Sequence, residues 1–107
     1  MQTIERDELK AALDSGAQIK LVMAMHQHQF EAAHIPGSVH LFDPTQAENL
    51  LAHDDDIIVY CSDRSCPASR VVSEKLIAAG YVRVRHYPGG LSEWLAAGYP
   101  LEGEDPR

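Results

Sequence analysis

Apolar and polar positions change spacing repeatedly along this chain, between helical and extended patterns. Near the N-terminus, Leu9, Ala12 and Leu13 follow the i, i+3, i+4 spacing of one helix face. Asp7 is the expected cap of this helix, and Gly16 is its expected end. Helical segments of this kind alternate with short β-rich runs along the whole length. That alternation predicts an α/β domain with a largely parallel sheet.

The extended runs predict where the sheet lies. Residues 19–24 form an apolar run that predicts a buried strand, and residues 82–84 predict a short one. The run from Ile57 to Tyr60 is β-branched and apolar without polar alternation. We therefore expect it at the centre of the sheet, buried on both faces, after an acidic turn at residues 54–56.

Further helices follow from the same patterns. A short helix is expected at residues 27–33, before Pro36 and Gly37 impose a turn ahead of extended residues 38–39. The other expected helices lie around Ala47, Leu50 and Leu51, over residues 68–79 with Val72, Leu76 and Ala79 on one face, and around Leu91, Trp94 and Leu95 after a turn at residues 88–90. The chain from Glu102 onward looks loose. We expect one domain over residues 1–107, with its core at about 4–103 and a loose tail at 104–107.

The composition fits such a domain. The chain has 107 residues, of which 45% are hydrophobic and 23% are charged, as is usual for a globular protein with its own apolar core. Folding is expected to need neither a disulfide nor a metal. No apolar run approaches the roughly 20 residues of a membrane helix, and residues 1–10 contain no apolar signal core. The expected location is the cytoplasm.

The net charge of the chain argues against two classes of partner. Nine Lys and Arg residues against 16 Asp and Glu residues give a formal net charge of −7. An acidic protein has little to hold a phosphate backbone, and an anionic bilayer repels it. Nucleic acid and membrane surfaces are therefore not expected partners. The oligomeric state leaves no signal in the sequence.

The two cysteines, Cys61 and Cys66, indicate reactivity. In a reducing compartment, metal binding or thiol chemistry explains such a pair better than a structural disulfide. A zinc site needs about four ligands, and the chain has no second cysteine pair. His26 and His28 are the one close pair among six histidines, and we interpret them as solvated. No metal or cofactor is expected.

Cys61 directly follows the predicted central strand, at its carboxyl end. In open α/β sheets ligands bind there, because the loops diverge beside helix N-termini. Pro67 suits the first helical positions, so unpaired N–H groups of the loop and the helix start are expected to point back at the Cys61 sulfur. Such a cradle would stabilise the thiolate, which is the nucleophilic form of cysteine.

The loop from Cys61 to Pro67 also supplies candidate substrate-binding groups. They are Ser62, Asp63, Arg64, Ser65 and Pro67, together with Arg70 in the first helical turn. Arg64 and Arg70 add positive charge for a small anionic donor such as thiosulfate, and Asp63 opposes it. Cys66 is a candidate resolving thiol. It would attack a persulfide or sulfenic acid on Cys61 and leave an internal disulfide for a cellular reductant to open.

Three segments of the chain resemble the rhodanese-like domain family. HIPGS at His34–Ser38 is similar to its first characteristic segment, IIVYC at Ile57–Cys61 to the strand that ends in its persulfide-bearing cysteine, and PGGLSEWLAAGYPL at Pro88–Leu101 to its closing segment. The resemblance covers about residues 4–103. It implies a rhodanese-like fold with a five-stranded, mainly parallel sheet flanked by helices on both faces.

The resemblance also implies a sulfurtransferase. Cys61 would attack the outer sulfur of thiosulfate or a persulfide donor, release sulfite in the first case, and pass the bound sulfur to a thiol or to cyanide. Cys66 and Pro67 stand where the common loop has Arg followed by Ser or Thr, which resembles a subset of the family with a second cysteine. Related phosphatases carry an arginine where this chain has Pro67, and this difference argues against phosphatase activity.

A second departure lies on another strand. The family commonly reads Asp-Val-Arg where this chain reads Met23, Ala24 and Met25. The polar contacts of that segment are therefore either replaced, with His26 as a candidate, or absent.

Two other functions stay open at this point. The first is a reductase in which Cys61 and Cys66 act as a redox pair against a disulfide, a peroxide or an arsenate-like oxyanion. The second is a binding module for a sulfur-carrying or regulatory protein, in which Cys61 has no catalytic role.

Overall fold

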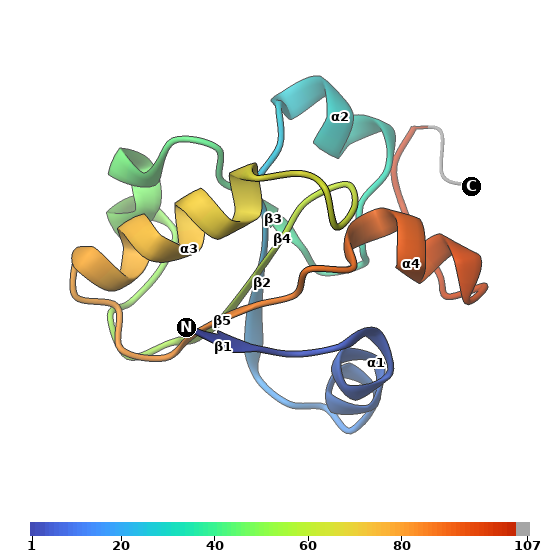
Figure 1. The fold of residues 1–107 in the computed structure, drawn as a ribbon, viewed down its shortest axis with the longest axis horizontal. Coiled ribbons are helices and arrows are strands. Elements are labelled where there is room, and N and C mark those ends of the chain that lie inside the picture. The colour runs from blue at the N-terminus through green and yellow to red at the C-terminus, as the bar shows by residue number, and fades with distance from the viewer. Residues whose placement is uncertain (105–107) are drawn as a thin grey trace.

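A computed structural model describes residues 1–104, and its centre is a parallel sheet of five strands (Figure 1). The strands are β1 (Gln2–Thr3), β2 (Ile19–Met23), β3 (Val39–His40), β4 (Asp56–Tyr60) and β5 (Val84–His86). Their order in the sheet is β1-β5-β4-β2-β3, and every pairing is parallel. The predicted five-stranded α/β sheet with β4 at its centre is confirmed. β1 was not predicted, because two residues carry no detectable periodicity.

The helices cover both faces of this sheet. They are α1 (Arg6–Asp14), α2 (Gln27–Ala32), the 3-10 helix η1 (Pro44–Asn49), α3 (Ala68–Ala78) and α4 (Gly90–Ala96). In Figure 1, α1 and α4 lie on one side of the sheet and α3 on the other, while α2 lies beyond the carboxyl end of β2. Within residues 1–104, none of these helices has the length and apolar character of a membrane span.

The apolar run of β4 is explained by burial on both faces. Ile58 and Tyr60 belong to the core cluster that includes Leu9 of α1 and Trp94 of α4. Ile57 and Val59 alternate with them and belong to the second cluster, which includes Val72 and Leu76 of α3. Each face of the strand is therefore apolar, so the sequence shows no polar alternation.

Two predicted helix details are wrong. The cap of α1 is Glu5 rather than Asp7, and the Glu5 backbone N–H donates to the Glu8 carboxylate at 3.4 Å, as in a capping box. The helix predicted around Ala47, Leu50 and Leu51 is a short 3-10 helix. Its tighter winding brings Ala47 into the core but leaves Leu50 exposed.

Two predicted segment ends also shift. Val82 is 74% exposed and lies in a bend, and the strand predicted at residues 82–84 is found two residues later, as β5 (Val84–His86). Ala79 is exposed and caps the end of α3 rather than joining its buried face. Apolar residues just outside these elements therefore displaced the predicted strand by two positions and lengthened the predicted helix by one.

Glu102 is held in place, contrary to the prediction that the chain loosens there. It forms an antiparallel bridge with His34, and its carboxylate lies 3.1 Å from the His34 ring Nε2. The Glu104 N–H donates to the Glu31 carbonyl at 2.8 Å. The rest of the predicted tail, residues 105–107, lies outside the described residues.

Candidate active site

Cys61 lies one residue beyond β4, at the carboxyl edge of the sheet, and its exposed fraction is 2%. Its neighbour across the sheet is the end of β2, where the Ala24 N–H donates to the Tyr60 carbonyl at 2.9 Å. The central strand therefore places the sulfur at the position where parallel sheets bind ligands.

The start of α4 orients the first peptide units of the loop. The Leu91 N–H donates to the Cys61 carbonyl at 3.1 Å, and the Ser92 N–H donates to the Ser62 carbonyl at 2.8 Å. In a trans peptide the N–H points opposite to the C=O, so the N–H groups of Ser62 and Asp63 point away from α4.

These N–H groups are available for a ligand. Among residues 1–104, the backbone N–H groups of Ser62, Asp63 and Arg64 have no hydrogen-bond acceptor. Three successive unpaired donors beside the N-terminus of α3 form a site suited to an anion. The Ser62 hydroxyl lies 4.0 Å from the Cys61 sulfur. The predicted cradle of these N–H groups around the Cys61 sulfur stays a prediction.

Gly90 lets α4 approach the loop this closely. An added Cβ at Gly90 would lie 2.6 Å from the Cys61 carbonyl oxygen and 2.8 Å from the Asp63 nitrogen. Its φ of +65° is also a conformation that favours glycine. The sequence had indicated only a turn at this glycine pair, and the close approach to the loop was missed.

Asp63 folds the middle of the loop back on itself. Its carboxylate accepts hydrogen bonds from the Ser65 backbone N–H at 3.0 Å and from the Ser65 hydroxyl at 2.6 Å. The Asp63 carbonyl accepts from the Cys66 N–H at 3.2 Å. The hydrogen bonds from Ser65 to the carboxylate hold the pKa of Asp63 below its usual value, so the carboxylate is ionised at neutral pH.

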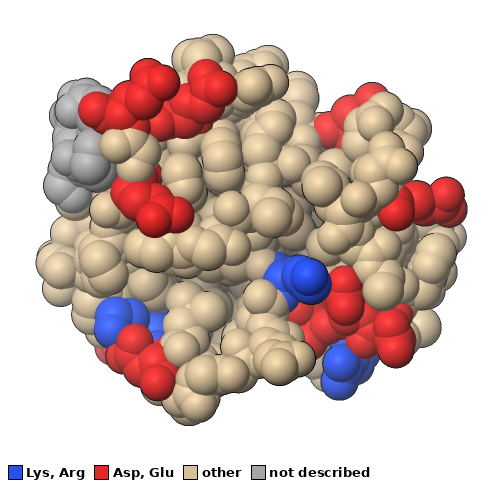
Figure 2. All heavy atoms as spheres, turned by 180° about the vertical axis from the view of Figure 1, so that it is seen from behind, with Lys and Arg blue, Asp and Glu red and all other residues tan. Residues whose placement is uncertain are grey.

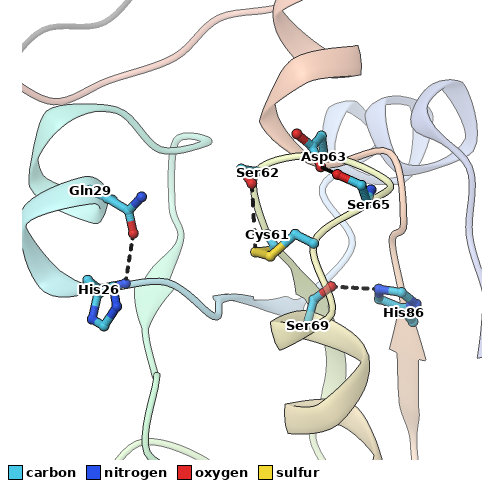
Figure 3. The surroundings of a disulfide bond; sticks show 9 residues. His26, Gln29, Cys61, Ser62, Asp63, Ser65, Ser69 and His86 are labelled. Atoms are coloured by element: carbon cyan, nitrogen blue, oxygen red, sulfur yellow. Dashed lines mark hydrogen bonds between the residues drawn. A yellow bond between two sulfur atoms is a disulfide. The ribbon is translucent and has the colours of Figure 1, made fainter.

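The turn brings Cys66 back to Cys61, and the two form a disulfide (Figure 3). Their Cα atoms are 6.4 Å apart. Figure 3 shows Ser62, Asp63 and Ser65 on the loop above this disulfide and Ser69 below it. Cys66 is half-buried and is followed by Pro67, the residue that caps α3. The structure thus joins the two predicted catalytic thiols, and their roles stay predictions.

The two predicted basic residues face different surroundings. Arg64 forms ion pairs with Glu5 and Glu93, which join the loop to α1 and α4 and raise the pKa of the guanidinium above its usual value. Two carboxylates therefore offset its charge. The Arg70 side chain is 72% exposed and lies 3.4 Å from Glu74. Donor binding by either arginine stays a prediction.

A Ser–His pair beneath the loop was missed by the sequence analysis. The buried Ser69 hydroxyl lies 2.7 Å from the His86 ring Nε2, which joins the first turn of α3 to the end of β5. Burial lowers the pKa of His86, and the charge of Arg70 lowers it further, so the ring is neutral at neutral pH. Only the fold brings these two residues together, so no sequence motif could indicate them.

The segment Met23–Met25 contributes packing rather than polar contacts. Met23 and Ala24 are fully buried, and Met25 is 8% exposed. His26 is exposed and caps α2, where its backbone N–H donates to the Gln29 side chain at 3.2 Å. In this segment the structure shows apolar burial followed by a helix cap, and the fate of the family's polar contacts stays a prediction.

The chain is similar to a protein family and to individual known proteins. The model of the rhodanese-like domain family matches residues 5–97. An HTH-type transcriptional regulator of Mycobacterium tuberculosis is 30% identical over 105 residues, and thiosulfate sulfurtransferase 18 of Arabidopsis thaliana is 37% identical over 60 residues. These matches cover 96% and 56% of this chain. The chain spans less than half of each relative, 46% and 43% respectively.

A solved structure shows the same fold. The solution structure of the rhodanese-like domain of an Anabaena protein superposes with a TM-score of 0.88 at 24% identity. The match covers 98% of this chain and 81% of that domain.

Proposed function

Because this chain belongs to the rhodanese-like domain family, we propose that it is a sulfurtransferase that carries a sulfane sulfur as a persulfide on Cys61. The observation that carries the proposal is the position of Cys61. It ends the central strand, next to three successive unpaired N–H groups and the N-terminus of α3. This surrounding stabilises both a thiolate and an anionic persulfide.

The first half-reaction is a displacement at sulfur. The Cys61 thiolate attacks the outer sulfur of thiosulfate, the S–S bond of thiosulfate breaks, and sulfite leaves with the electron pair. The N–H groups of Ser62, Asp63 and Arg64 hold the terminal sulfur of the resulting persulfide. An acceptor thiol or cyanide then takes that sulfur and returns Cys61 to the thiolate.

Backbone groups, rather than side-chain charge, dominate donor binding in this proposal. The Arg64 charge is offset by Glu5 and Glu93, and Arg70 extends into solvent. Ser65 and Pro67 shape the loop, and the Ser62 hydroxyl lies next to the sulfur. A small donor that fits N–H groups suits this site better than one that needs a cationic pocket.

We place the reaction in the cytoplasm, with a small sulfur anion as donor and a small-molecule or protein thiol as acceptor. The thiol reductants of that compartment would keep the Cys61–Cys66 pair open. Figure 2 supports the exclusion of nucleic acid, because the few basic side chains on that face lie beside acidic ones. Such an arrangement provides no continuous basic surface there for phosphates.

Formation of thiocyanate from thiosulfate and cyanide tests this function. After reduction of the disulfide, we expect Cys61→Ser to lower the rate by at least about 100-fold, because the nucleophile is lost. Cys66→Ser is the matched control, since it makes the same change in the same loop and leaves the first step in place. Equal rates for wild type and Cys61→Ser would refute the proposal.

The disulfide favours a second candidate, a reductase in which Cys61 and Cys66 cycle between dithiol and disulfide. In that case both serine variants would lose turnover of a disulfide or peroxide substrate equally, and thiosulfate would yield no thiocyanate. A chain that shows neither activity, with both variants unchanged, would instead be the binding module.

A further inference from the structure

The Cys61–Cys66 disulfide points to an activity beyond transfer to an external acceptor. We propose that Cys66 discharges the Cys61 persulfide within the chain and releases the sulfane sulfur as hydrogen sulfide. This inference rests on the proposed function, because it needs a persulfide on Cys61. It makes the domain a sulfide-forming reductase of thiosulfate when no external acceptor is bound.

The geometry identifies which sulfur Cys66 attacks. A persulfide has an inner sulfur, Cys61 Sγ, and an outer sulfane sulfur. The disulfide joins the two Sγ atoms, so the fold lets Cys66 reach the inner one. The turn held by the Asp63 carboxylate and Ser65 fixes this approach, and the Asp63 carbonyl also accepts from the Cys66 N–H.

The reaction balances without another co-reactant. The Cys66 thiolate attacks Cys61 Sγ, and the bond between that atom and the sulfane sulfur breaks. The electron pair leaves with the sulfane sulfur, which takes the proton that the Cys66 thiol gave up and departs as HS⁻. Each cysteine sulfur is oxidised by one electron, and the sulfane sulfur is reduced by two. The unpaired N–H groups of Ser62, Asp63 and Arg64 stabilise the anion that leaves.

Exposure determines how the disulfide is reopened. Cys61 is 2% exposed, whereas Cys66 is half-buried, so an external dithiol meets the Cys66 sulfur first. Attack on Cys66 breaks the disulfide and leaves Cys61 as the thiolate, ready for the next donor. The net reaction converts thiosulfate and a dithiol into sulfite, sulfide and a disulfide.

A single-turnover experiment tests this inference. The full chain is reduced, freed of reductant under anaerobic conditions, and mixed with thiosulfate without cyanide or added thiol. Sulfite, sulfide and the intact mass are then measured. We expect the wild type to release sulfite and sulfide in equal amounts and to become lighter by two hydrogens. For Cys66→Ser we expect normal sulfite, sulfide lower by at least about tenfold, and a mass gain of one sulfur.

The outcomes separate the inference from the proposed function. If the wild type releases sulfite but keeps the extra sulfur, the function holds and the inference fails. Location of that sulfur on Cys66 would also overturn the inference, because Cys66 would then be a relay that attacks the outer sulfur. If no variant releases sulfite, the proposed function itself fails. Cys61→Ser should release neither product.

Discussion

The neighbouring strands β2 and β4 end at the same side of the sheet, but the loop after β4 is polar whereas the two residues after β2 are apolar. Met23 at the end of β2 pairs in register with Tyr60 at the end of β4. β4 continues into Cys61 and a polar loop with unpaired N–H groups, whereas β2 continues into buried Ala24 and Met25. The candidate site therefore follows β4, and the adjacent end of β2 is apolar.

Of these two strand ends, the one after β4 has partners for its polar groups. Polar groups in the β4 loop are compensated locally, by the turn of Asp63 and by the N-terminal N–H groups of α4. At the end of β2, the side chains of Met23, Ala24 and Met25 instead pack into the two core clusters. A charge is thus tolerated at one strand end and costly at the other.

Substitution of Met23 should reveal this difference most strongly. Met23→Asp places a carboxylate at a fully buried position without a partner, and we expect the free energy of unfolding to fall by about 4 kcal/mol. Met23→Leu conserves volume and should cost about 1 kcal/mol. Ser62→Asp makes the same change at the β4 end and should cost about 0.5 kcal/mol, because Ser62 is half-buried. Denaturant unfolding measures the stability of all three variants. Equal losses of stability for Met23→Asp and Ser62→Asp would contradict the difference between the two strand ends.

A smaller effect is expected from the glycine that brings α4 against the loop. Gly90→Ala adds backbone strain at positive φ and a Cβ 2.6 Å from the Cys61 carbonyl oxygen, and we expect a cost of about 3 kcal/mol. Gly98 has a similar φ of +75° with open space around it, so Gly98→Ala isolates the strain, at about 1 kcal/mol. Thermal unfolding of both variants is the measurement. A Gly90→Ala chain as stable as Gly98→Ala would show that the loop and α4 are not tightly coupled.

Most helices and strands were predictable because the spacing of apolar residues along the chain indicates them. The all-apolar run at residues 57–60 indicated the central strand, and the position of Cys61 followed from it. The errors lie where propensity is weak: the two-residue β1, the 3-10 winding of η1 and the exposed Val82. In these places tertiary contacts, rather than local spacing, decide the conformation.

The site was predictable only in part. The loop and its two cysteines are contiguous in the sequence, so their proximity could be expected. The pairing of Arg64 with Glu5 and Glu93 and the contact of Ser69 with His86 join residues that lie far apart in the chain. No single-sequence pattern indicates such partners. The apolar packing of Met25 likewise depends on neighbours that only the fold supplies.

The most direct test of a persulfide on Cys61 is the intact mass of the reduced Cys66→Ser chain after treatment with thiosulfate. Removal of Cys66 prevents internal discharge, so the bound sulfur should accumulate. We predict a gain of one sulfur atom that cyanide removes and that is absent when Cys61 is also changed to Ser. An unchanged mass after thiosulfate, in a chain that remains folded, would contradict the account.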